Sequence, residues 1–191
     1  MFFPAVFFSC NSDQEVFSPK PKGYFRIDLP ENKYLNYSSS CPFSFESSVY
    51  SSVTPDIRRG AEPCWLDIVY PKFNATIHLS YKPVQNNIAK FLEDSRILVT
   101  KHEVKASSID EQVIVKDSVK VYGLIYNIEG NTASALQFYL TDSTQHFVRG
   151  ALYFNALPNS DSIAPVLSFI RKDVYRMIQS FQWRNNLNDK F

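Results

Sequence analysis

The spacing of apolar residues changes several times along the chain, and each change predicts a different kind of element. Apolar and polar residues alternate in three early segments, which is typical of strands with one buried face. These segments are 23–29, 64–70 and 73–81. Pro30 is expected to end the first strand, because proline cannot donate a hydrogen bond to a sheet. Further short strands are expected within the serine-rich stretch 36–60, with a loop over 51–62.

Two segments instead show the helical period, in which apolar residues recur every three or four positions. The first is 86–104, with a stripe of Ile88, Phe91, Leu92, Leu98, Val99 and His102. The second is expected to follow a cap at Asp161 or Ser162, with Pro165 in its first turn. Its stripe comprises Ile163, Val166, Leu167, Ile170, Val174, Met177, Ile178 and Phe181.

Strand-like segments joined by tight turns lie between the two predicted helices, at 112–115, 119–129, 132–141 and 146–155. Such a run predicts an antiparallel meander. Because strands and helices are not interleaved, the predicted class is α+β, with an antiparallel sheet backed by two amphipathic helices. The expected organisation is a single domain over 23–184, with a tether at 10–22 before it and a frayed tail at 185–191 after it.

Composition excludes several classes of function. With 191 residues, 45% of them apolar, the chain can bury a real core, so disorder of the whole chain is excluded. Lysine and arginine count 20 against 19 aspartates and glutamates, and this net charge of +1 argues against nucleic-acid binding. The nearest two of the five glycines, Gly123 and Gly130, are seven residues apart, which excludes the clustered-glycine loops that hold phosphates.

The first ten residues resemble the end of a lipoprotein signal peptide. A phenylalanine-rich run over 1–9 leads to Cys10, and the chain then turns polar. This predicts a partial signal peptide at 1–9 and a lipid on the Cys10 thiol, which would attach the chain to a membrane. The run is short and lacks a basic residue, so two interpretations stay open. Either the signal begins upstream of Met1, or the chain is cytosolic with free thiols. No other run is apolar enough for a transmembrane helix.

The two remaining cysteines, Cys41 and Cys64, are expected to pair if the chain is exported, because disulfides persist in oxidising compartments. Two buried free thiols are the alternative. The sequence contains no C-x-x-C, and no histidine lies at metal-ligand spacing from either cysteine. We therefore expect no metal and no cofactor.

Candidate chemistry is sparse. No nucleophile sits in a recognised local context, and no H-E-x-x-H occurs. Arg149 shares a strand phase with Phe147, Ala151 and Tyr153, which suits either core structure or a binding patch. An envelope hydrolase or a small-ligand-binding module would need a pocket formed by His78, Arg96, His102 and Arg149. Each of these histidines has a structural role as its alternative.

A series of collinear motifs spans residues 10–183. They are 19–30, 41–45, 63–66, 77–82, 93–96, 140–143, 146–154 and 158–162. Together they resemble the GldD family of gliding motility lipoproteins of Bacteroidetes. The order of elements is also similar to the PsbP/Mog1-type α+β sandwich.

The resemblance to GldD implies a lipid-anchored, non-catalytic protein of the cell envelope, with Cys10 as the lipid site. It implies support of gliding motility and of the associated type IX secretion apparatus, through contacts with other proteins of that machinery. The expected location is the outer membrane, on its periplasmic side. The resemblance implies no catalytic residue and no ligand.

Overall fold

The computed structural model describes residues 27–155 and 160–184. The predicted signal segment 1–9, the lipidation site Cys10, the tether 10–22 and the tail 185–191 therefore lie outside the described residues.

Seven strands form a large antiparallel sheet in the order β3-β4-β5-β9-β8-β7-β6. Their bounds are β3 Ser52–Pro55, β4 Leu66–Tyr70, β5 Ala75–Pro83, β6 Ala106–Lys116, β7 Val121–Gly130, β8 Ser134–Thr141 and β9 His146–Phe154. Strands β6 to β9 are consecutive neighbours, so the predicted meander is confirmed. Asp142 stabilises the turn between β8 and β9, where its carboxylate accepts hydrogen bonds from the backbone N–H groups of 144, 145 and 146.

A smaller sheet has the order β1-β2-β10. It consists of β1 Tyr34–Ser38, β2 Phe43–Ser48 and β10 Gln182–Trp183. Strand β2 confirms the short strands expected within 36–60, whereas β10 and the separate sheet were not predicted. Phe43 and Phe45 of β2 are fully buried against Phe181, which follows the second helix. Strand β2 and the residue that follows α2 thus meet in one aromatic cluster.

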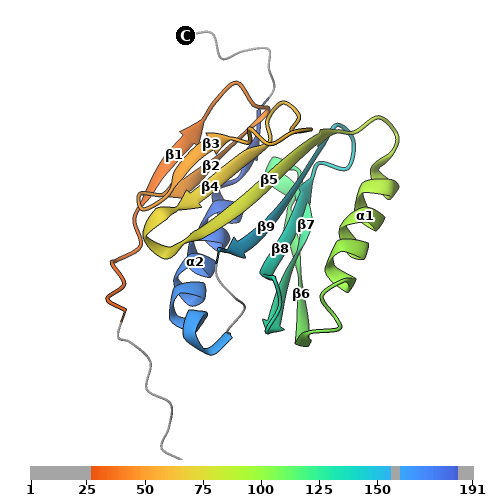
Figure 1. Ribbon diagram of the computed structural model, residues 1–191. Coiled ribbons are helices and arrows are strands. Elements are labelled where there is room, and N and C mark those ends of the chain that lie inside the picture. Colours follow the sequence, from red (N-terminus) through yellow and green to blue (C-terminus); the bar gives the residue numbers. More distant parts are fainter. Residues whose placement is uncertain (1–26, 156–159, 185–191) are drawn as a thin grey trace, which may run out of the picture.

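The two helices cover opposite faces of the large sheet (Figure 1). Helix α2, Ser160–Ser180, buries its apolar stripe in the main core together with the small sheet. Helix α1, Ile88–Thr100, lies on the other face. Strand β7 shows the division: Val121 and Ile125 belong to the main core, whereas Tyr126 and Ile128 pack with Val99 of α1. The α+β class with a helix-backed antiparallel sheet is confirmed.

Several predicted boundaries are wrong. Residues 27–33 form no strand, although 23–29 alternates; the chain instead runs beside α2, where Asn32 donates a hydrogen bond to Asp173. The predicted loop 51–62 contains β3, a four-residue edge strand in which Val53 alone packs against the core, too short to give an alternation signal.

The helix boundaries also differ. Helix α2 begins at Ser160, so Asp161 and Ser162 lie in the helix rather than capping it, and Pro165 lies inside it. Helix α1 ends at Thr100, which leaves His102 in the following turn. Such shifts arise because the hydrophobic period does not mark where the terminal hydrogen bonds are lost.

A disulfide joins Cys41 to Cys64, with 5.5 Å between their Cα atoms. Cys41 lies in the turn between β1 and β2, and Cys64 lies just before β4. The bond therefore ties the small sheet to the large one.

Candidate functional site

Polar side chains gather on the face of the large sheet that carries α1. Along β5 the even-numbered residues point to this face, because Leu79 belongs to the core on the other side. The register of β5 with β9 sets Ser80 opposite Arg149, and His78 lies two residues along the same strand. His78 and Arg149, two of the four predicted pocket residues, therefore share one sheet face.

Arg149 carries a half-buried positive charge. Its Nη2 donates a 2.5 Å hydrogen bond to Gln137 Oε1, and its guanidinium also interacts with the Tyr153 side chain. Burial lowers the pKa of the guanidinium, but an arginine keeps its proton in proteins. None of the ion pairs among the described residues includes Arg149. Within that part of the chain, no carboxylate balances this charge.

Gln137 of β8 adds an unused donor beside Arg149. Its side chain is buried, and its Oε1 is occupied by Arg149. Its Nε2 has no hydrogen-bond partner among the described residues. Burying such a donor without an acceptor costs about 1–3 kcal/mol. Gln137 thus holds the guanidinium of Arg149 through its Oε1 while its own amide stays buried.

A groove of about 280 Å³ opens between α1 and the sheet. We call it the α1 groove and define it by Trp65, Lys82, Lys90, Phe91, Phe147 and Arg149. Its aromatic wall is continuous, because the ring centres of Phe91 and Phe147 lie 5.3 Å apart. Asp94 also lines it, so the groove combines three cations with one carboxylate.

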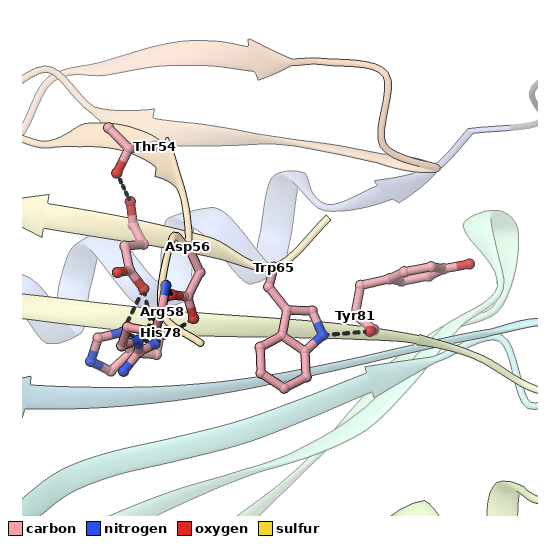
Figure 2. A network of polar contacts seen from close by, with 7 residues as sticks. Thr54, Asp56, Arg58, Trp65, His78 and Tyr81 are labelled. Carbon is pink, nitrogen blue, oxygen red and sulfur yellow. Dashed lines mark hydrogen bonds and ion pairs between the residues drawn. The ribbon is translucent and has the colours of Figure 1, made fainter. Parts of the chain in front are cut away.

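Trp65 forms one wall of the α1 groove and is itself held in place by a hydrogen bond. Its Nε1 donates a hydrogen bond to the Tyr81 carbonyl oxygen at 3.0 Å (Figure 2). Lys82 Nζ lies 5.0 Å from the centre of the indole ring, within cation–π range, and also pairs with Glu62. Trp65 directly follows Cys64, so the disulfide restrains the backbone beside this wall.

A second set of charged side chains, the Asp67 cluster, consists of Asp56, Arg58, Asp67 and His78 (Figure 2). His78 Nδ1 lies 2.5 Å from Asp67 Oδ1 and 3.1 Å from Arg58 Nη2. Hydrogen bonding from Arg58 lowers the pKa of Asp56 to about 2. The His78 ring lies 5.5 Å from the ring of Tyr153, which in turn neighbours Arg149. The cluster thus continues the polar face toward the groove.

The Asp67–His78 contact resembles part of an acid–base arrangement, because a carboxylate can orient an imidazole. Both printed contacts of His78 use Nδ1, and Arg58 competes for that nitrogen. Among the hydrogen bonds of the described residues, none links His78 to a serine, threonine or cysteine side chain. The described cluster supplies a base and an orienting group without a nucleophile held by the base.

The other two predicted pocket residues lie on or after α1. Arg96 is exposed and forms an ion pair with Glu93, with 2.8 Å between Nη2 and Oε1. His102 is half-buried; burial and, secondarily, the charge of Arg149 lower its pKa. His102 does not line the groove that contains Arg149, and Arg96 is paired with its own helix neighbour.

Sequence reasoning missed Trp65, Lys82 and Asp67. Asp67 and His78 each lie at a polar position of an alternating strand, on the face away from the core. This alternation was the signal in the sequence that could have indicated their exposure on one sheet face. Their meeting depends on the β4–β5 register, in which Asp67 lies directly opposite His78. That register is set by pairing across the sheet, which one sequence does not reveal.

In the described ranges, no three histidine, cysteine, aspartate or glutamate side chains lie close enough to hold a metal ion together. None of the helices in that part of the chain combines the length and apolar character needed to cross a membrane.

The fold and site define a disulfide-linked α+β protein with a charged groove under one helix. Comparison with protein families places the chain more closely. It belongs to the family described as gliding motility lipoprotein GldD, whose model matches residues 14–183. A gliding motility lipoprotein is anchored to a membrane of the cell envelope. The expected lipid site, Cys10, precedes the matched range.

The chain is also similar to the solution structure of cyanobacterial PsbP (CyanoP) from Synechocystis sp. PCC 6803. The two share 10% identity with a TM-score of 0.49, over 87% of this chain and 99% of the other. No curated protein matches the sequence.

Proposed function

We propose that this chain is a non-catalytic lipoprotein, held to the outer membrane on its periplasmic side by a lipid on Cys10. It supports gliding motility and the associated type IX secretion apparatus through contacts with other proteins of that machinery. The family match over residues 14–183 carries the proposal. The apolar run before Cys10 and the Cys41–Cys64 disulfide support export, since disulfides persist outside the reducing cytosol.

Two acyl chains or more give durable membrane attachment, whereas one binds reversibly. Replacing the chromosomal copy with Cys10→Ala therefore tests the proposal. We expect the variant to move from the membrane fraction to the soluble fraction and the cells to lose gliding. A matched Cys10→Ala variant carrying the lipidation segment of an unrelated lipoprotein should restore both. A Cys10→Ala protein that stays in the membrane fraction and supports gliding would contradict the anchor.

The Asp67–His78 contact favours one rival, an envelope hydrolase that uses His78 as its base. Our proposal predicts that His78→Ala leaves gliding unchanged in cells where the protein accumulates normally. The hydrolase would be favoured if His78→Ala abolished gliding and only histidine at position 78 restored it fully.

A further inference from the structure

We propose that the α1 groove binds a carboxylate that a partner protein presents on an apolar segment. This inference rests on the proposed function, because it assigns the surface through which the chain makes one of its protein contacts. It names the chemistry of that contact: a carboxylate beside an aromatic or large aliphatic side chain.

The charges of the groove favour the binding of an anion. Arg149 is half-buried without a carboxylate partner among the described residues, and Gln137 Nε2 beside it lacks an acceptor. A guanidinium binds a carboxylate through two parallel hydrogen bonds, and such charge-assisted bonds are strong where water is partly excluded. Lys90 lies on the same groove, while Lys82 already pairs with Glu62. The bound carboxylate would balance the charge of Arg149, which lines the groove and is held by Gln137 from behind.

The aromatic walls of the groove favour a ligand that carries an apolar side chain next to its carboxylate. Phe91 and Phe147 pack together at one side, and Trp65 is fixed at another by its bond to the Tyr81 carbonyl. At about 280 Å³ the groove lies just below the range of pockets that enclose whole small molecules. It has room for one carboxylate and one adjoining side chain, which fits a peptide segment better than a larger ligand.

A membrane surface is a weaker match to the same residues. Anionic lipid surfaces are held by clusters of four to eight lysines and arginines. The α1 groove has three cations, and Asp94 on its rim opposes them. The aromatic walls would also have no partner in a phosphate headgroup.

The proposal can be tested with a probe that has only the two required features. We would titrate the ¹⁵N-labelled 191-residue chain with N-acetylphenylalanine and follow the side-chain N–H signals of Trp65 and Gln137 by NMR. We expect saturable shifts of both signals. N-acetylphenylalaninamide keeps the ring but lacks the carboxylate, so it should bind about tenfold more weakly.

Two variants form a matched pair. Arg149→Gln should weaken the binding of N-acetylphenylalanine about tenfold, because a charge-assisted pair is lost. Arg96→Gln removes the same charge from the exposed side of α1, where it is paired with Glu93, and should change nothing. If Arg149→Gln does not fold, judged by its thermal transition, Lys90→Gln replaces it and should weaken binding about twofold or more.

Three results would overturn the inference: no saturable shift, equal binding of the amide, or unchanged binding by folded Arg149→Gln and Lys90→Gln. Arg149-dependent shifts with inorganic phosphate or phosphatidylglycerol vesicles, without any for N-acetylphenylalanine, would overturn it in favour of a lipid headgroup. These results leave membrane attachment at Cys10 untouched. A failed Cys10→Ala test would in turn leave binding in the groove intact, so the two failures are distinguishable.

Discussion

At the scale of single residues, Asp173 is the most constrained charge in the described core. Its side chain is buried, and Asn32 donates to its Oδ1 at 2.7 Å. Burial raises the pKa of this carboxyl, although the nearby polar side chains of Asn32, Ser48, Tyr34 and Tyr70 partly offset the rise. Its Oδ2 has no hydrogen-bond partner among the described residues. The same surroundings raise the pKa of Tyr34 to about 12. Asp173 thus holds the segment before β1 against α2 at an electrostatic cost.

This cost predicts a pH dependence. A carboxyl whose folded pKa exceeds its unfolded value binds its proton more tightly in the folded state, so stability falls as pH rises between those two values. Asp173→Asn removes that titration. We expect the free energy of unfolding of Asp173→Asn, measured by urea denaturation, to improve relative to wild type from pH 3 to pH 7. The exposed control Asp94→Asn should show no such trend. If the free energies of unfolding of wild type and Asp173→Asn differed by the same amount at every pH, the raised pKa of Asp173 would be contradicted.

At the scale of elements, a lysine of the edge strand β6 supplies hydrogen bonds to the C-terminal end of α2. Lys116 Nζ donates hydrogen bonds to the carbonyl oxygens of Ile178, Gln179 and Phe181, at 3.2, 2.7 and 2.9 Å. A helix leaves its last carbonyls without partners, and a cation there also interacts favourably with the helix dipole. The lysine therefore caps α2 and ties it to β6.

Removing this cap should destabilise the protein. Lys116→Met keeps the apolar stem and deletes the ammonium group. We expect it to lower the free energy of unfolding by about 1.5–3 kcal/mol, as for hydrogen bonds to charged groups. Lys101→Met, at the exposed end of α1, is the control and should stay within about 0.5 kcal/mol of wild type. Equal effects of the two substitutions would show that the cap contributes nothing.

Elements were predictable from the sequence where one face is buried. The stripe of α2 has a strong helical period, because one face packs on the core. The strands of the meander were found from their apolar character and the turn signals between them. Helix α1 was found although only Ser95 and Val99 are buried in it, and this partial cover is what leaves the groove open. Strands β3 and β10 were missed, since such short strands depend on pairing partners distant in sequence. The groove itself required Trp65 and Arg149 to meet, which register and packing decide.

At the scale of the whole molecule, the disulfide joins the two sheets. Cys41 and Cys64 are separated by 23 residues, and closing a loop of this length contributes about 3 kcal/mol. We choose Cys64→Ser as the test. Cys64 has a positive φ of 65°, and serine carries a Cβ as cysteine does, so the backbone strain at this position stays the same. We expect it to lower the free energy of unfolding by about 3 kcal/mol, and reduced wild type to show a similar loss. Free thiols at both positions in the native protein would contradict the bond.

We propose that a lipid on Cys10 attaches this α+β domain to the cell envelope. Mass spectrometry of the N-terminal peptide, from protein purified out of its own cells, tests this directly. We expect a peptide that begins at Cys10 and carries the added mass of a diacylglycerol group on its sulfur. A peptide that continues upstream through Phe8 and Ser9 to an unmodified Cys10 thiol would contradict it.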